Sequence, residues 1–307
     1  MSLHASSSKK QSRELPNDRV EKVHNRWSLS KALEERLKKT SQSEQTDINR
    51  LRRQVSFDRL LARLFHDGSV PWVLKGGYAL ELRFKMARST VDIDLTIGRV
   101  DDAPDSSDVN QVVRELLQAA ASLPLGDWFE FTIGSPVMDI TAAPYGGARY
   151  PVEVRMDEIF AKFHLDAGIG DIVIHPVERI ETRDWLAFAG IEGSQVQLIA
   201  REQQFAEKIH AYTLPRSATN SRVKDLVDMA LLIGDSTLDQ QRTLNALRLT
   251  FERRATHPLP NTLEAPPYEW ERPFQELAKE CGLPPELNVV FERVRLFFED
   301  VLANQST

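Results

Sequence analysis

Two aspartates, Asp92 and Asp94, stand two residues apart in the apolar segment RSTVDIDLTIG. Successive side chains of a β-strand point to opposite faces, so the two carboxylates share one face, and Val91, Ile93 and Leu95 take the other. Like charges held this close repel each other unless a cation lies between them. Carboxylate oxygens are ligands for divalent cations, so the pair predicts a divalent metal site. The alternative interpretation is a solvated strand end.

A glycine turn precedes the aspartates, in the segment WVLKGGYALELRF. The segment reads as a short apolar strand, a turn at Gly76 and Gly77, and then a helical run. A glycine turn lets backbone N–H groups approach a phosphate closely. Together with the carboxylates, the turn predicts a site for a nucleoside triphosphate and Mg²⁺. Lys75, directly before the turn, and Arg222 complete the residues predicted to bind the nucleotide.

A third carboxylate is a candidate for the same metal. Asp166 lies in AKFHLDAGIGD, which reads as a second short strand, and His164 shares its face. On a neighbouring strand, Asp166 would complete a cradle of three carboxylates. Glu153 and Asp157, in PVEVRMDE, are alternatives for that place, and each of the three acids can also be an ordinary strand carboxylate.

Two later segments with helical periodicity carry further charged candidates. Lys208 lies among apolar residues in REQQFAEKIHAY, where a lysine commonly extends its ammonium group to solvent. In SRVKDLVDMALLI one face is an apolar stripe, and Asp225 and Asp228 lie on the polar side. With Arg222, these acids would line a cleft. Alternatively, the helix lies on the surface, with Lys224 and Asp228 as an i, i+4 pair.

The elements that position these residues follow from hydrophobic periodicity and turn signals. Two helices are expected between Ser28 and Phe65, the second from Ile48, and residues 1–18 are expected to be disordered. Strands are expected at 72–74, 91–97, 128–133, 137–142, 151–156, 161–168 and 171–174. Further helices are expected at 78–86, 109–122, 197–214, 221–233, 238–252, 274–281 and 286–303.

Several strands in succession after one helix favour a mixed sheet over a doubly wound parallel sheet. The predicted fold class is α/β (α+β), a small mixed-sheet core with N-terminal helices and a C-terminal helical domain. The predicted boundaries give a partly disordered, basic helical segment at 1–66, the core at 67–190 and the helical domain at 191–307.

Composition narrows the class of protein. At 307 residues, 41% hydrophobic and 27% charged, the chain is typical of a globular protein with a substantial core. No apolar run approaches the ~20 residues needed to cross a bilayer, so no membrane partner is expected. The polar N-terminus lacks the apolar core of a secretory signal. Cys281 is the only cysteine, which excludes an internal disulfide and indicates a reducing, cytoplasmic location.

Charge is distributed unevenly. The net charge is −6, but residues 1–63 carry fifteen Lys/Arg and eight Asp/Glu, which leaves about +7 there and about −13 elsewhere. This polarity suits a polyanion held at one end and a metal site at the other. Solvated helix faces are an equally good explanation.

The combination of motifs resembles the AbiEii-type nucleotidyltransferase toxin family, a branch of the polymerase-β-like nucleotidyltransferase superfamily. The segments LKGGYALELRF, STVDIDLTI, FHLDAGIGD, EKIHAY and RVKDLVDMALLI occur in the order and context of that family. The basic opening helices and the late stretch around Pro266, Pro267 and Trp270 are similar as well. The likeness covers roughly residues 25–300, and it places a nucleotidyltransferase core at 67–190.

The resemblance implies roles for individual residues. Gly76 and Gly77 would contact phosphate, and Asp92 and Asp94 would be metal ligands. Lys208 would contact the triphosphate. Two further acids complete the implied site: Asp225 would support that lysine or the reacting group, and Asp166 matches the superfamily's third carboxylate. The superfamily's turn is commonly Gly-Ser, so Gly77 removes a hydroxyl there, and the role of Tyr78 after it is open.

The predicted activity is Mg²⁺-dependent transfer of a nucleotide from a nucleoside triphosphate, with release of pyrophosphate. Some relatives of the family modify the 3′ end of tRNA, so RNA is the expected acceptor, and the toxin resemblance implies a cognate antitoxin. Transfer to a small molecule or a protein hydroxyl is the nearest alternative. A non-catalytic module that binds nucleic acid or a partner protein is the more distant one.

Overall fold

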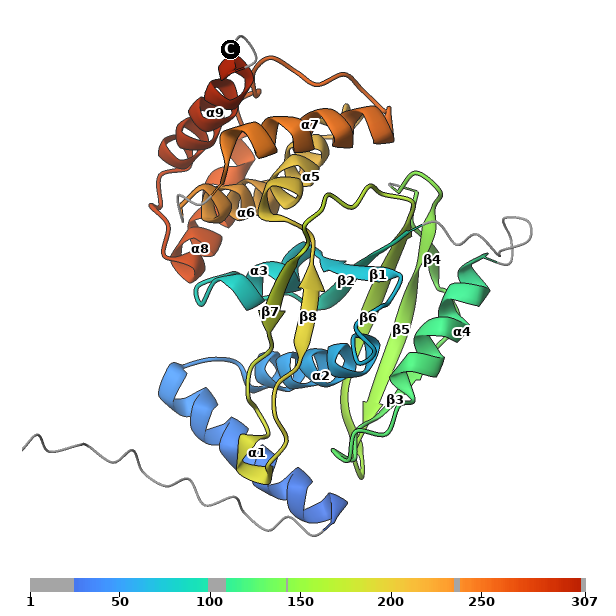
Figure 1. Cartoon of the computed structure of the whole chain (residues 1–307). Coiled ribbons are helices and arrows are strands. Elements are labelled where there is room, and N and C mark those ends of the chain that lie inside the picture. Colours follow the sequence, from blue (N-terminus) through green and yellow to red (C-terminus); the bar gives the residue numbers. More distant parts are fainter. Residues whose placement is uncertain (1–24, 99–108, 142, 235–237, 305–307) are drawn as a thin grey trace, which may run out of the picture.

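The computed structural model describes residues 25–98, 109–141, 143–234 and 238–304. The stretch 1–18, predicted to be disordered, lies outside them. Within these ranges the chain folds into one mixed sheet with helices on its faces and at one end (Figure 1). The predicted fold class, a mixed-sheet α/β protein, is confirmed. No helix in these ranges is long and apolar enough to cross a membrane.

The sheet has the strand order β3-β5-β6-β2-β1-β8-β7, with β4 paired to β5. Strands β2 and β6 pair in parallel, as do β1 and β8, and the other neighbours are antiparallel. The strand bounds are β1 Trp72–Lys75, β2 Asp92–Ile97, β3 Glu130–Ile133, β4 Met138–Asp139, β5 Gly147–Arg155, β6 Ile159–Ile169, β7 Glu178–Glu181 and β8 Gln195–Leu198.

The pairing register aligns four charged residues in one row across the sheet. Lys75 of β1 lies opposite Asp94 of β2, and Asp94 lies opposite Asp166 of β6. Asp166 in turn lies opposite Arg149 of β5. Residues that face one another on neighbouring strands lie close enough for their side chains to interact. The sheet therefore joins two carboxylates at its centre to a cation on each side.

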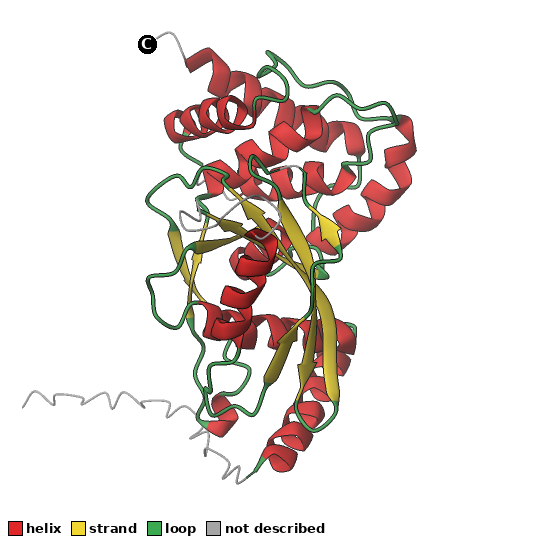
Figure 2. Cartoon of the chain, turned by 90° about the vertical axis from the view of Figure 1, so that its right-hand side faces the viewer, coloured by secondary structure: helices red, strands yellow, loops and turns green. Residues whose placement is uncertain are grey.

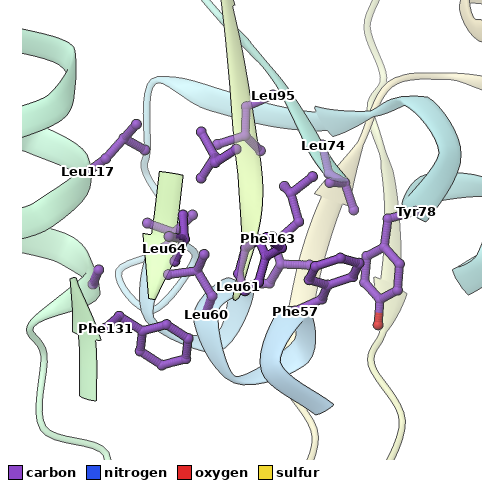
Figure 3. Packing of buried hydrophobic residues seen from close by; sticks show 14 of the residues in the cluster. Phe57, Leu60, Leu61, Leu64, Leu74, Tyr78, Leu95, Leu117, Phe131 and Phe163 are labelled. Carbon is purple, nitrogen blue, oxygen red and sulfur yellow. The ribbon is translucent and has the colours of Figure 1, made fainter. Parts of the chain in front are cut away.

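Two N-terminal helices support the sheet. Helix α1 (Arg26–Glu44) begins with a capping box formed by Asn25 and Ser28, and Asp47 caps α2 (Ile48–Leu64). Phe57 of α2 packs edge-to-face on Tyr78 and Phe163, with ring centroids 4.8 and 4.7 Å apart (Figure 3). The apolar side of α2 thereby fixes the sheet from one face.

The remaining helices are α3 (Gly76–Arg83), α4 (Val109–Ala121) and a C-terminal group. That group comprises α5 Arg201–Thr213, α6 Val223–Gly234, α7 Gln240–Arg254, α8 Glu271–Cys281 and α9 Leu287–Ala303, with the 3₁₀ turn η2 Tyr268–Trp270 before α8. The 3₁₀ turn η1 Ala187–Ala189 precedes β8 and packs against the sheet's cluster. The group sits at one end of the sheet and encloses a hydrophobic cluster separate from the sheet's cluster (Figure 2). The domain boundaries at 66 and 190 stay a prediction.

Some predicted elements are wrong. Residues 171–174 form no strand, because the side-chain amide of Gln203 bonds their backbone, donating to the carbonyl of Ile172 and accepting from the N–H of Ile174. Strands β7 and β8 were not predicted, and the helix expected from residue 197 begins at Arg201. Each of these strands has four residues, too short for an alternating pattern to stand out.

Candidate active site

A cleft of about 350 Å³ lies between the sheet and the C-terminal helices. It brings together segments from β1, α3, β2, α5, α6 and α7. Eight of the nine residues predicted for the site line it: Lys75, Gly76, Gly77, Asp92, Asp94, Lys208, Arg222 and Asp225. Its volume falls in the usual range for small-ligand sites.

Asp94 is half-buried, as Asp92 is, and it requires a glycine beside it. Gly76 has a φ of +70°, and a Cβ there would lie 1.9 Å from Asp94 Oδ2. Only a residue without a side chain permits this approach. Burial, and then the charge of Asp166, raise the pKa of Asp94 to about 6, although Lys208 and Lys75 act in the other direction. The protonated form of Asp94 is therefore favoured mainly by burial.

Asp166 lies beside Asp94 but is already bound to an arginine. Arg149 donates from Nε to Asp166 Oδ1 at 2.7 Å and from Nη2 to Oδ2 at 2.7 Å. Its Nη2 also reaches Asp92 Oδ2 at 3.2 Å. The hydrogen bonds and charge of Asp166, and then the charges of Asp92 and Asp94, raise the pKa of Arg149 above its ordinary value. The guanidinium thus bridges Asp166 and Asp92, beside the position between Asp92 and Asp94 where a metal cation was predicted.

The competing acids lie elsewhere. Glu153 faces Lys162 across the β5–β6 pair and bonds to it at 2.8 Å, and it also accepts from Arg155. Asp157 lies in the bend between β5 and β6. Of the three candidates, Asp166 is therefore the one that the register sets opposite Asp94.

Lys208 does not extend to solvent. Its Nζ lies 2.8 Å from Asp225 Oδ1 and 2.8 Å from Asp228 Oδ2, and its side chain is 15% exposed. Burial alone would lower the pKa of Lys208, but Asp225 and Asp228 raise it above its ordinary value. Asp228 is fully buried and forms a two-bond pair with Arg88, at 2.8 Å each. The alternative surface pair with Lys224 is therefore wrong.

Asp225 and Arg222 complete the helical side of the cleft. Asp225 Oδ2 is buried and has no hydrogen-bond partner among the described residues. Arg222 Nη1 lies 3.6 Å from that oxygen, and its side chain is 43% exposed. Asp225 therefore holds Lys208 with one oxygen and keeps the other available to accept a hydrogen bond.

Lys75 belongs to a second ion cluster that the sequence did not predict. Its Nζ lies 2.8 Å from Asp171 Oδ2 and 3.4 Å from Glu207. Arg254 of α7 bonds Asp171 at 3.0 and 2.9 Å and lies 3.2 Å from Glu207. Burial would raise the pKa of Asp171, but Lys75 and Arg254 lower it to about 2. Two cations and two anions thus connect β1 to α5 and α7.

The glycine turn opens helix α3 toward the cleft. Lys75 is the N-cap residue, and its side chain makes no capping hydrogen bond. The first backbone N–H groups of a helix attract anions. Tyr78, whose role was open, points into the core, where its hydroxyl donates to Asp58 (Figure 3). Tyr78 is thus a packing residue that orients the turn from behind.

The donor atoms of the described residues decide what kind of metal site the cleft can form. Among the described residues, no group of three or more His, Cys, Asp and Glu side chains is arranged to hold one. Asp92 and Asp94 line the cleft, and both oxygens of Asp166 are bound to Arg149. Mg²⁺ in triphosphate sites takes one or two carboxylates, and phosphate and water oxygens supply the rest. The cleft therefore fits a metal that arrives with a triphosphate, rather than a closed protein cage.

The chain matches one family model and is similar to several solved structures. Residues 59–298 match the family model described as "Nucleotidyl transferase AbiEii toxin, Type IV TA system". The nucleotidyltransferase toxin MenT4 of Mycobacterium tuberculosis is similar in structure, with 20% identity, a TM-score of 0.47, and coverage of 85% of this chain and 94% of that one. JHP933 of Helicobacter pylori follows at 16% identity and a TM-score of 0.38, over 83% and 98%. No curated protein matches the chain.

Proposed function

Because the chain belongs to the AbiEii family of nucleotidyltransferase toxins, which act in type IV toxin–antitoxin systems, we propose that it transfers a nucleotide to RNA with Mg²⁺ as cofactor. The observation that supports this most is the meeting of Lys208 with Asp92 and Asp94 in one cleft. Lys208 is far from the two aspartates in the sequence, and the activity needs all three side chains at once.

The cations of the cleft bind the triphosphate in this proposal. Lys208 and Lys75 supply charge, and the N–H groups of the glycine turn donate to phosphate oxygens. Asp225 holds Lys208 in place with one oxygen, and its unpartnered Oδ2 accepts from a hydroxyl of the nucleotide. Lys208 is already ionised and fixed before the substrate arrives, so little reorganisation is needed when charge develops on the leaving pyrophosphate.

Asp92 and Asp94 act on the acceptor hydroxyl in this proposal. A hydroxyl oxygen of the acceptor attacks the α-phosphorus, the bond from that phosphorus to the bridging oxygen breaks, and pyrophosphate leaves. Mg²⁺ held by Asp92 and Asp94 would neutralise phosphate charge and make the attacking hydroxyl more acidic. The hydroxyl proton passes to a carboxylate of this pair. Asp166 is less suited, because Arg149 occupies both of its oxygens.

The basic residues of the N-terminal helices bear on the choice of RNA as acceptor. Much of the basic charge near the N-terminus is used internally, because Arg50, Arg52, Arg59 and Arg63 of α2 all pair with acids. That charge supports RNA binding less than the sequence predicts. The family match supports nucleotidyl transfer and an antitoxin partner, and it names no acceptor.

The test is incubation of purified protein with each α-labelled nucleoside triphosphate, Mg²⁺ and total RNA. We expect label in RNA, and we expect Asp94→Asn to remove it without lowering the melting temperature, because it takes away a carboxylate that burial disfavours. Label in protein, or in a small molecule, would transfer the proposal to that acceptor. No labelled product with any nucleotide would contradict nucleotidyl transfer.

A further inference from the structure

A second groove, of about 630 Å³, adjoins the cleft and shares Val91 and Asp92 with it. Its other walls come from α2, from the end of β3 and from the paired strands β5 and β6. A molecule in this groove therefore lies against the same carboxylate that lines the nucleotide cleft. The shared wall makes the groove the place from which a second substrate meets the first.

The groove contains an arginine with an unsatisfied donor. Arg53 of α2 lines it, and Arg53 Nε is buried with no hydrogen-bond partner among the described residues. Its neighbours on α2 differ, because Arg50, Arg52, Arg59 and Arg63 each bind an acid among the described residues. A buried donor left unpaired destabilises the fold. Such a guanidinium points to an anion that arrives with a ligand, and phosphate matches its geometry.

The rest of the groove fits a nucleotide. Val91 is 55% exposed, and with the half-buried Pro151 it offers apolar surface to a base. Lys162, 63% exposed and paired with Glu153 of the same groove at 2.8 Å, adds a second cation at the rim. His164 Nδ1 lies 3.7 Å from Asp92 Oδ1, so polar groups meet where the groove reaches the shared carboxylate. The groove thus offers cations to a phosphate, apolar surface to a base, and polar groups to a ribose hydroxyl.

We infer that this groove binds the terminal nucleotide of a single-stranded RNA acceptor, with its phosphate at Arg53 and Lys162 and its ribose hydroxyl beside Asp92. The inference rests on the proposed function. The groove is a different RNA site from the exposed lysines of α1, because the groove is continuous with the cleft and those lysines are not.

Binding of a fluorescein-labelled, mixed-sequence hexaribonucleotide to the full chain tests this, by anisotropy over a range of salt concentrations. The groove variant is Arg53→Gln with Lys162→Gln. The matched control is Lys38→Gln with Lys39→Gln, which removes the same charge from α1. We expect the groove variant to raise the dissociation constant about tenfold and to reduce the salt slope by about 0.7, since the two cations hold one phosphate and each single-strand phosphate contact contributes about 0.7. The control should bind as the wild type does.

Binding of nucleoside triphosphate, measured on the same proteins, separates the possible failures. Unchanged triphosphate affinity and melting temperature in the groove variant show that it is folded. Wild-type RNA affinity in that variant, or a loss only in the α1 control, overturns the groove assignment. A wild-type protein that binds triphosphate but no hexaribonucleotide overturns it too, and leaves nucleotidyl transfer standing. A wild-type protein that binds no triphosphate overturns the proposed function itself.

Discussion

Arg149 donates hydrogen bonds to both oxygens of Asp166, the carboxylate that the strand register sets opposite Asp94. A third acid in this position is what a site for two metal ions would use. Here a guanidinium already neutralises it and also reaches Asp92. The arrangement therefore favours a single metal ion at Asp92 and Asp94, with Arg149 in place of a second.

Replacing Arg149 tests this directly. Arg149→Gln should release Asp166 and let the site take a second divalent cation, so that Mn²⁺ bound per chain rises from about one toward about two. Electron paramagnetic resonance of Mn²⁺, with a non-hydrolysable triphosphate present, measures the number. Arg155→Gln is the control, because Arg155 lies on the same strand and bonds Glu153 outside the cleft. Two ions per chain in the wild type would refute the single-metal interpretation.

Lys208 has a structural and a chemical role that one double variant separates. Lys208→Met alone should destabilise the fold by roughly 3 kcal/mol, because Asp225 and Asp228 lose a buried counter-charge. Adding Asp225→Asn removes one of these acids, and Arg88 still pairs with Asp228. The double variant should regain stability in thermal unfolding, yet remain about 10²-fold slower in transfer. Recovery of turnover together with stability would reduce Lys208 to a structural residue.

Gly76 is predicted to be essential for the position of Asp94. Gly76→Ala should weaken Mn²⁺ and triphosphate binding, because the new Cβ would displace the Asp94 carboxylate. Gly68→Ala is a matched control, since Gly68 has a φ of +67° and open space around it. Both variants should lose about 1 kcal/mol of stability from the left-handed backbone. Calorimetric titration with both ligands makes the comparison, and equal affinities in the two variants would count against the contact.

Stability should depend on pH through His210 of α5. Burial, with Arg254 and His257, lowers the pKa of His210 from 6.5 to about 4. The folded state therefore binds fewer protons than the unfolded state between these values. The stabilisation is complete above pH 6.5 and is lost as the pH falls toward 4, by no more than about 3 kcal/mol. Urea unfolding of the wild type and His210→Gln over this range should give a flatter profile for the variant, and parallel profiles would exclude the effect.

Local patterns predicted much of the site. The spacing of Asp92 and Asp94, the glycines after an apolar strand, and the helix with Asp225 are each readable within a short window, because strand and helix periods fix which side chains share a face. The resemblance to a known family singled out Lys208, which the pattern alone left as a surface residue. The mixed sheet followed from the succession of strands.

The partners of these residues could not be predicted in the same way. Arg88 meets Asp228, 140 positions later in the chain, and Arg254 meets Asp171 from a different helix. Such pairs depend on strand register and helix placement, which one sequence does not specify. The role of Arg149 is the clearest case, because an alternating strand pattern shows its face but not which acid lies opposite.

The cluster of Lys75, Asp171, Glu207 and Arg254 has a mechanical consequence. It joins β1 to α5 and α7, at the seam between two separately packed cores. A triphosphate in the cleft competes with Asp171 and Glu207 for the same cations, so binding substrate weakens the joint. We therefore expect the helical group to be held less firmly against the sheet when a triphosphate is bound. Amide hydrogen exchange along this seam would quicken, rather than slow, when nucleotide binds.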